Sequence, residues 1–298
     1  MEWDRAQLAA LAAVVEEGSF EGAARRLHLT PSAVSQRIRA LEARAGQVLV
    51  RRARPGGATR AGTVLVRLAG QIALLEHEVA TLLGTEDDRG RTGPFTVTLA
   101  VNADSLDSWF APVLLDLPDG IVLDVRTADQ DRSADLLRDG TAMAAVTADP
   151  SPVQGCRSVP LGAMPYLAVA APDFRSRWFP RGVDASSLAQ APQVAYDPHD
   201  ALQRRFAEQH GAQDAAPVHH VPAQRAFTAA IGAGLGWGMV PSAAAAPLVA
   251  RGDLVELSPG STVDVPLVWQ HWRLDSPVLN HLTDAVRRAA ARALRSSF

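Results

Sequence analysis

Apolar residues recur at helical spacing near the start of the chain. Those between residues 4 and 17 lie three or four positions apart, as Leu11 and Val15 do, which predicts a helix. Gly18 is the kind of residue that commonly ends a helix, and Ser19 offers a capping hydroxyl for a second, short helix. The chain therefore begins with two helices joined by a tight turn.

A third helix is predicted to follow and to run to about Arg44. Thr30 can cap it, and Pro31 occupies the first helical position, where its missing N–H costs nothing. The segment QVLVRRARPGGA, residues 47–58, then has two short extended arms around a Pro-Gly-Gly turn. We expect these arms to form a hairpin.

A fourth helix, capped by Thr59 and running through Leu83, carries a narrow apolar stripe. The apolar positions alternate by three and four residues: Leu65, Leu68, Ile72, Leu75, Val79 and Leu82. A heptad seam of this kind on a single helix would face water, so we expect a second copy of the chain to cover it in a coiled coil. The alternative is that the seam packs on the C-terminal half of its own chain.

Beyond the polar segment GTEDDRGRTGP, residues 84–94, short apolar strands alternate with helices. The strand candidates are FTVTLAV, IVLDVRT, AMAAVT and YLAVAA. This alternation predicts α/β construction with mostly parallel sheets. The glycine-rich segment at residues 232–239 follows a helix and precedes a strand, the reverse of a phosphate-binding loop, so we interpret it as a turn.

The third helix presents a polar, cationic face. Its inward face is predicted to consist of Val34, Ile38 and Leu41. Ser32, Gln36 and Arg39 then point outward, where arginine can pair with guanine and glutamine with adenine. Short helices, a turn and a third helix with such a face have the form of a helix-turn-helix, whose recognition helix enters the DNA major groove.

The distribution of charge supports a division into an N-terminal DNA-binding part and a second part beyond residue 92. Residues 1–62 hold ten arginines against six acids, whereas residues 92–298 hold sixteen against twenty-one. The single cysteine, Cys156, excludes an internal disulfide and fits a reducing compartment. With no signal-peptide pattern and no apolar run of membrane-spanning length, we expect a cytoplasmic protein that makes no membrane contact.

The sequence carries no pattern typical of an enzyme or a cofactor site. Walker, zinc and nucleophile-elbow motifs do not occur, and His219 and His220 are adjacent on a predicted strand, so they point to opposite faces. We therefore expect no enzymatic activity, no catalytic residue, no cofactor and no bound metal.

The run from Phe20 to Arg44, with AARRLHLTPSAVSQRIRALE at its centre, and TRAG at residues 59–62 resemble the LysR-type transcriptional regulators. The resemblance continues through LAVNADSLDSWFAP, GLGWGMVP and DVPLVWQHW to the lysine- and arginine-responsive ArgP and LysG branch, and covers essentially the whole chain. Tyr196 stands where this branch often has phenylalanine. The resemblance implies a homodimer or homotetramer that binds double-stranded DNA, senses lysine or arginine and controls a basic amino-acid exporter. If it activates transcription, RNA polymerase is a further partner.

The residues expected to contact DNA lie on the third helix, its cap and the hairpin. They are Thr30, Ser32, Ser35, Gln36, Arg37, Arg39, Arg51, Arg52 and Arg54. The hairpin arginines would add affinity through the DNA backbone without much reading of sequence; the alternative is a solvated basic surface.

The residues expected to bind the effector follow predicted strands, because open α/β sheets bind ligands beyond the carboxyl ends of strands. They are Asn102, Asp104, Ser105, Trp109, Asp129, Gln130, Asp131, Tyr196 and Asp197. We expect Ser105 to cap a helix beginning at Leu106 and to cradle a carboxylate. Asp129 and Asp131 would hold an ammonium or guanidinium group, unless they only cap the next helix, and Trp109 can equally fill the core.

The resemblance also implies a domain plan with a two-lobed effector domain like that of periplasmic binding proteins. The expected parts are a winged helix-turn-helix at 1–58, a linker helix at 59–84, a hinge at 85–94 and an effector domain at 95–298. Within the effector domain, lobe 1 would comprise about 95–164 and 268–298, and lobe 2 about 165–267. Two alternatives stay open: a LysR-type regulator of another metabolite, such as an aromatic or organic acid, and a cytoplasmic amino-acid-binding protein.

Overall fold

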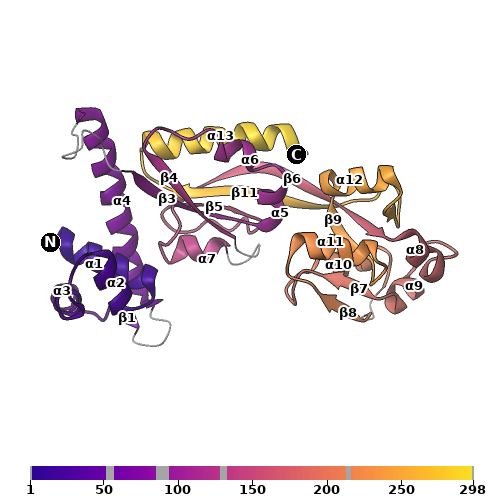
Figure 1. Ribbon diagram of the computed structural model, residues 1–298, viewed down its shortest axis with the longest axis horizontal. Helices are drawn as coiled ribbons and strands as arrows, with labels where there is room; N and C mark the ends of the chain where they lie inside the picture. Colours follow the sequence, from indigo (N-terminus) through magenta and orange to yellow (C-terminus); the bar gives the residue numbers. More distant parts are fainter. Residues whose placement is uncertain (1, 52–56, 85–93, 128–132, 213–215, 297–298) are drawn as a thin grey trace. The chain divides into compact units, whose positions relative to one another are not determined.

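The computed structural model describes residues 2–51, 57–84, 94–127, 133–212 and 216–296 (Figure 1). The chain forms two compact units. Unit 1 comprises Met1–Asn102, Pro112–Val159 and Val268–Arg288. Unit 2 comprises Ala103–Ala111, Pro160–Leu267 and Ala289–Phe298. The predicted DNA contacts Arg52 and Arg54 and the predicted effector residues Asp129, Gln130 and Asp131 lie outside the described residues.

Unit 1 begins with the three predicted helices, α1 (Arg5–Glu17), α2 (Phe20–Arg26) and α3 (Pro31–Ala45). Each of them starts at a side-chain cap. The Asp4 carboxylate accepts from the Gln7 amide, Ser19 Oγ from Gly22, and Thr30 Oγ1 from Ala33. Glycines in the left-handed conformation end α1 and α3. The prediction of three helices is confirmed.

A short antiparallel pair, β1 (Val50–Arg51) and β2 (Gly57–Ala58), supplies the arms of the predicted hairpin. The long helix α4 (Arg60–Leu83) follows, capped by Thr59 as predicted. A Cβ on Gly62 would lie 2.0 Å from the Leu49 carbonyl oxygen, so only glycine lets α4 approach the chain before the hairpin this closely.

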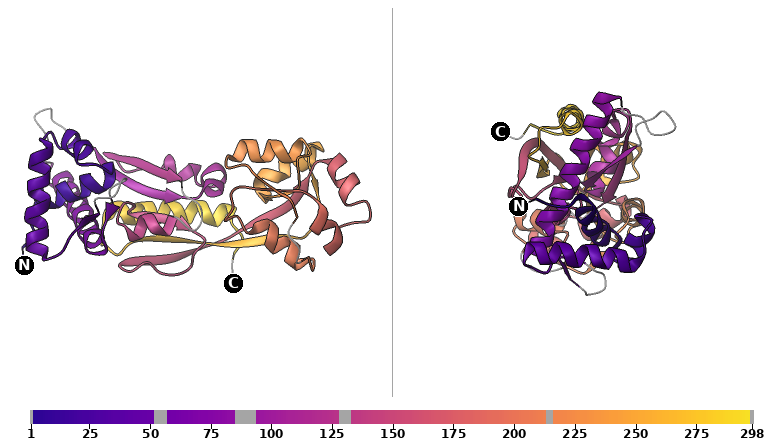
Figure 2. Two further views of the ribbon diagram at one scale, coloured as in Figure 1. Left: turned by 90° about the horizontal axis from the view of Figure 1, so that it is seen from below. Right: turned by 90° about the vertical axis from the view of Figure 1, so that its left-hand side faces the viewer.

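The three helices and the first half of α4 share one apolar core. Figure 2 shows these indigo and purple helices clustered together. Its buried members include the predicted inward face of α3, since Val34, Ile38 and Leu41 are all 3 % exposed or less. Leu65 of the heptad stripe is also buried in this core. The first half of the stripe is therefore covered by the chain's own helices.

The rest of unit 1 is built on a sheet with helices beside it. Its strands are β3 (Phe95–Val101), β4 (Ile121–Thr127), β5 (Ala144–Thr147) and the end of β11 (Val263–Trp272). The helices are α6 (Ala111–Leu114), α7 (Ser133–Arg138) and most of α13 (Pro277–Ala293). β3 pairs in parallel with β4 and β5, whereas β11 runs antiparallel to β5.

Helix α4 also contacts this second part of unit 1 through a different face from its heptad stripe. The Arg67 guanidinium donates to the carbonyl oxygens of Leu137 and Gln154. Three turns later, the buried Glu78 carboxylate accepts hydrogen bonds from Ser276 Oγ at 2.5 Å and from the Val278 amide at 3.2 Å. Glu78 thus satisfies a donor at the start of α13.

Unit 2 is also α/β. Its helices are α5 (Ala103–Ser108), α8 (Pro172–Trp178), α9 (Ala185–Gln190), α10 (Leu202–Gln209), α11 (Gln224–Gly232) and α12 (Ser242–Arg251). Its strands are β6 (Cys156–Ala170), β7 (Gln193–Ala195), β8 (Val218–His220), β9 (Gly238–Pro241) and β10 (Val255–Glu256), with β6 beginning in unit 1. An apolar core that includes Val169, Phe227 and Val240 joins strands and helices.

Two details of the predicted pattern are wrong. The sheets are mixed rather than mostly parallel, because β6 pairs antiparallel with β9 and β10, and β11 with β5. The helix expected to begin at Leu106 begins at Ala103, directly after β3. Ser105 therefore lies inside α5 and does not cap it.

Candidate functional site

The first candidate site is the outer face of α3. Ser32, Gln36 and Arg39 are exposed, and Ser35 and Arg37 on the flanks are partly exposed. This orientation follows from the apolar spacing, which turns Val34 and its partners into the core. Among the described residues, Arg37 and Arg39 have no carboxylate partner, so their charge is available to a ligand. The predicted outward face is confirmed, while its contact with DNA stays a proposal.

Two other predicted DNA contacts have local structural roles. Thr30 Oγ1 accepts from the Ala33 amide at 3.2 Å and lies 2.9 Å from Ser32 Oγ. Arg51 Nε donates to the Ala58 carbonyl at 3.0 Å, which fastens the two arms of the hairpin. Both residues are nevertheless exposed. Arg52 and Arg54 lie outside the described residues.

The second candidate site starts where β3 ends. Asn102, Ser105 and Trp109 are 2 %, 0 % and 4 % exposed. Among the described residues, neither the Asn102 amide nor Ser105 Oγ nor Trp109 Nε1 finds a hydrogen-bond partner. Buried polar groups are normally hydrogen-bonded, so unpaired ones mark places where a ligand or water completes the set. Trp109 packs edge-on against Phe110, which also fits the core role left open above.

Asp104, on α5, lies at the centre of a polar cluster in unit 2. Tyr166 Oη donates to its carboxylate at 2.5 Å. The pKa of Asp104 is raised to about 6: burial is the main cause and the nearby carboxylates of Asp200 and Asp107 add to it, against the lowering effect of hydrogen bonds from Tyr166 and Gln224. Among the described residues, no arginine or histidine pairs with Asp104. This carboxyl group therefore lacks the cation that a buried acid usually has.

The loop after β7 holds the second member of the cluster. Asp197, predicted to contact the effector, accepts from the amides of His199 and Asp200 and so stabilises a turn, while its contact with the effector stays a prediction. Asp200 accepts from the Tyr196 and Leu202 amides and from Gln203 Nε2 at 3.2 Å. Its carboxylate, not that of Asp197, is the one near Asp104.

The other predicted effector residues divide into two groups. Tyr196 follows β7 as expected and is partly buried. Asp129, Gln130 and Asp131 lie outside the described residues. Sequence reasoning missed Tyr166, Asp200 and Gln224, because no local motif surrounds them and they meet Asp104 only through the fold.

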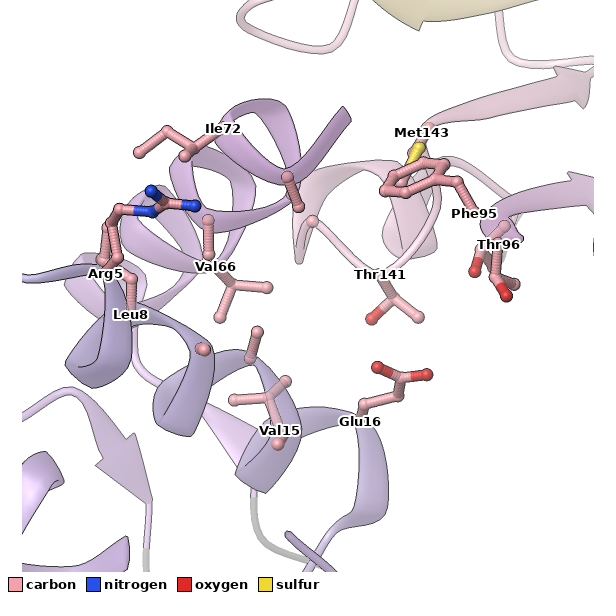
Figure 3. Close-up of a pocket in the computed structure, with 18 of the residues that line it drawn as sticks. Arg5, Leu8, Val15, Glu16, Val66, Ile72, Phe95, Thr96, Thr141 and Met143 are labelled. Atoms are coloured by element: carbon pink, nitrogen blue, oxygen red, sulfur yellow. The ribbon is translucent and has the colours of Figure 1, made fainter. Parts of the chain in front are cut away.

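A separate cavity of about 490 Å³ lies in unit 1, among α1, α4, β3 and the segment before β5 (Figure 3). Glu16 and Thr141 point toward each other across it, and apolar side chains such as Val66 and Ile72 line one side. Its charged lining residues already have partners, because Arg5 pairs with Glu76 and Arg26 with Glu16. The cavity therefore shows little unsatisfied polar chemistry.

Three further features limit the other chemistry available to the described residues. They contain no group of three histidine, cysteine or acidic side chains that could hold a metal ion. None of their helices combines the length and apolar character needed to cross a membrane. Burial raises the pKa of the Cys156 thiol, which opposes reactivity as a thiolate.

Comparison with known proteins gives the family. Residues 6–63 match the model of the bacterial regulatory helix-turn-helix protein, lysR family, and residues 93–291 match the LysR substrate binding domain. The chain is 50 % identical over 293 residues to the HTH-type transcriptional regulator LysG of Mycobacterium tuberculosis, covering 98 % of this chain and 95 % of that protein. It is 41 % identical to the lysine export transcriptional regulatory protein LysG of Corynebacterium glutamicum, covering 97 % and 98 %.

Solved structures agree. The crystal structure of ArgP from Mycobacterium tuberculosis superposes with a TM-score of 0.89 at 49 % identity, over 99 % of this chain and all of that one. Full-length LysG from Corynebacterium glutamicum with bound effector arginine gives 0.77 at 40 % identity, over 98 % and 100 %. With both domain models matched in order and relatives aligned along nearly their whole length, this chain belongs to the LysR family of bacterial helix-turn-helix transcriptional regulators.

Proposed function

We propose that this LysR-family regulator senses a basic amino acid, lysine or arginine, and controls the gene of a basic amino-acid exporter. The observation that carries the proposal is the similarity, along nearly the whole chain, to a LysG whose structure holds arginine as effector. A carboxyl group without a cationic partner at Asp104 supports it, because an anionic effector would favour arginines there instead.

DNA binding is assigned to α3 and the hairpin. Ser32, Gln36 and Arg39 face the base edges of the major groove, with Ser35 and Arg37 on the flanks. The Thr30 end of α3 and the hairpin arginines Arg51, Arg52 and Arg54 contact phosphates. The exposure of the α3 face and its unpaired arginines support this assignment.

The domain plan and assembly are part of the proposal. The winged helix-turn-helix spans 1–58, the linker helix 59–84, the hinge 85–94 and the effector domain 95–298. Helix α4 pairs with its counterpart in a second copy, and the regulator acts in the cytoplasm without enzymatic activity or a cofactor. Binding of the effector changes the arrangement of paired DNA-binding domains, which requires different affinities for the two assembly states.

Calorimetry on the full-length protein tests the effector assignment. Lysine and arginine should bind with dissociation constants in the micromolar to millimolar range, since two or three charge-assisted hydrogen bonds offset the cost of ordering the ligand. Benzoate and citrate serve as aromatic and organic-acid controls. Binding of an organic acid without binding of either basic amino acid would refute the proposal.

Asp129, Gln130 and Asp131 stay effector candidates from the sequence. Replacing both Asp129 and Asp131 by asparagine should abolish the lysine or arginine response if their carboxylates hold one of the cationic groups. A response of unchanged affinity in that double variant would remove them from the site.

A further inference from the structure

The polar cluster around Asp104 holds two neighbouring carboxylates and, among the described residues, no cation. Asp104 receives side-chain hydrogen bonds from Tyr166 Oη and from Gln224, while the carboxylate of Asp200 accepts from two backbone amides and from Gln203 and places a second negative charge nearby. Gln203, 2 % exposed, donates its Nε2 to Asp200, which places its amide beside that carboxylate. Among the described residues, the Gln203 Oε1 atom has no partner.

Two neighbouring carboxylates held away from water are costly when no cation lies beside them. A positively charged group that only donates offsets the repulsion between them and gives the unpaired Gln203 amide oxygen a donor. Ammonium and guanidinium groups have this character, with three and five N–H donors. The neighbouring Ser105 Oγ, fully buried and unpaired among the described residues, offers a further contact on α5.

We propose that Asp104, held by Tyr166 and flanked by Asp200, receives a cationic group of the effector and releases its own proton when it does so. This inference rests on the proposed function, because it names the residue that selects a basic amino acid. The effector's amine or guanidinium stays charged throughout, and the proton from Asp104 passes to solvent. Tyr166 is a positioning residue, which orients the carboxylate through its hydroxyl.

Because effector binding releases the proton of Asp104, the affinity for the effector should depend on pH. Because the pKa of Asp104 lies at about 6 in the free protein, the carboxyl group is about nine-tenths protonated at pH 5 and almost fully ionised at pH 8. The groups that face it are Asp107 on its own helix, Tyr166 on β6, Asp200 before α10 and Gln224 on α11. None of these groups carries a positive charge.

The test is calorimetry of the full-length protein with arginine at pH 5, 6 and 8, in buffers of different ionisation enthalpy. We expect affinity about tenfold weaker at pH 5 than at pH 8, with release of roughly half a proton at pH 6 and almost none at pH 8. Asp104→Asn should weaken binding at pH 8 at least tenfold and remove the pH dependence. Tyr166→Phe should move the midpoint of the pH dependence upward, because it removes a hydrogen bond that lowers the pKa of Asp104.

Two controls test whether the effect is specific to Asp104 and which cation of arginine it contacts. Asp173→Asn removes an exposed carboxylate from α8 of the same unit and should leave arginine affinity within about twofold at pH 8. Citrulline lacks the guanidinium of arginine, and Nα-acetylarginine lacks its α-ammonium. The analogue whose affinity is the same for wild type and Asp104→Asn lacks the cation that contacts Asp104. Circular dichroism confirms that each variant is folded.

Failure of the inference is distinguishable from failure of the proposed function. If the wild-type protein binds neither lysine nor arginine, the proposed function is wrong. If it binds them with the same affinity and no proton release from pH 5 to pH 8, or if Asp104→Asn binds as tightly as wild type, the effector class stands and the role of Asp104 is refuted.

Discussion

Besides its proposed role in binding, the carboxyl group of Asp104 lowers the stability of the folded chain when it is ionised. The folded chain holds the proton of Asp104 up to about pH 6, whereas the unfolded chain loses it near the ordinary value of 3.8. Between these values the unfolded chain binds fewer protons, so stability falls as the pH rises and stays lowered above pH 6. A buried carboxylate without a cationic partner is expected at a site where the ligand supplies the positive charge.

Asp104→Asn should therefore raise the free energy of unfolding at pH 8, by up to about 3 kcal/mol. The gain should shrink as the pH falls and be mostly lost at pH 4, because the wild-type carboxyl group is then protonated in the folded chain and partly protonated in the unfolded chain. Urea unfolding at pH 8 and pH 4 measures the difference. A gain that is equal at both pH values would contradict the raised pKa of Asp104, and Asp173→Asn serves as the exposed control.

Glu78 is a second buried acid, but its charge has partners. Its Oε1 atom accepts from Ser276 Oγ and the Val278 amide at the start of α13. Glu78→Ala leaves these donors unpaired, so we expect a loss of about 1–3 kcal/mol in the free energy of unfolding. Thermal unfolding is the measurement. Glu76→Ala, which removes a surface ion pair with Arg5, should cost less than about 1 kcal/mol; equal losses would argue against the capping role of Glu78.

At the scale of the element, α4 has surfaces with different uses. Leu65 is buried in the core of the N-terminal helices, and Arg67 and Glu78 contact the sheet-containing part of unit 1. Leu75, Val79 and Leu82 remain 39 %, 53 % and 81 % exposed. Apolar side chains in a row on one helix face are typical of a surface that another chain covers. The second half of the heptad stripe therefore keeps the predicted role of a contact between copies.

Val79→Glu should weaken self-association by placing a charge in that contact. We expect analytical ultracentrifugation to show a shift toward monomer at micromolar concentration. Thr81→Glu is the matched control, because Thr81 is exposed and lies off the stripe. An unchanged sedimentation coefficient for Val79→Glu would place the contact between copies elsewhere.

At the scale of the whole molecule, the positive charge is concentrated toward the N-terminus. Residues 1–62 hold ten arginines and six acids, although the chain carries a net charge of −3. Binding to DNA should depend on this local excess and not on net charge, because phosphate contacts release counterions locally. Arg39 combines an exposed position on α3 with the donor geometry that reads guanine.

Arg39→Ala should weaken binding to the protein's own promoter region by roughly 5- to 150-fold across a salt series, since one bidentate base contact is lost. Fluorescence anisotropy with the promoter and a scrambled duplex measures affinity and discrimination. Arg181→Ala, an exposed arginine of unit 2, should change neither. If Arg39→Ala kept full affinity for the promoter, α3 would not be the reading helix.

The sequence by itself determined the elements whose causes are local. Side-chain caps at Ser19, Thr30 and Thr59, together with apolar spacing, specify where helices start and which face of α3 turns outward, because these signals act within one or two turns. The same pattern located most strands. It placed the start of α5 at the wrong residue, since the helix begins directly where β3 ends, without a side-chain cap that could be recognised.

Only the tertiary structure decided which polar residues act together. Asp104, Tyr166, Asp200 and Gln224 are far apart along the chain, and no periodic pattern links them. Their meeting depends on β6 carrying Tyr166 and on the turn at Asp197 presenting Asp200, and the raised pKa of Asp104 depends on burial that sequence spacing does not encode. Local propensities specify elements, whereas desolvation and charge proximity are properties of the packed chain.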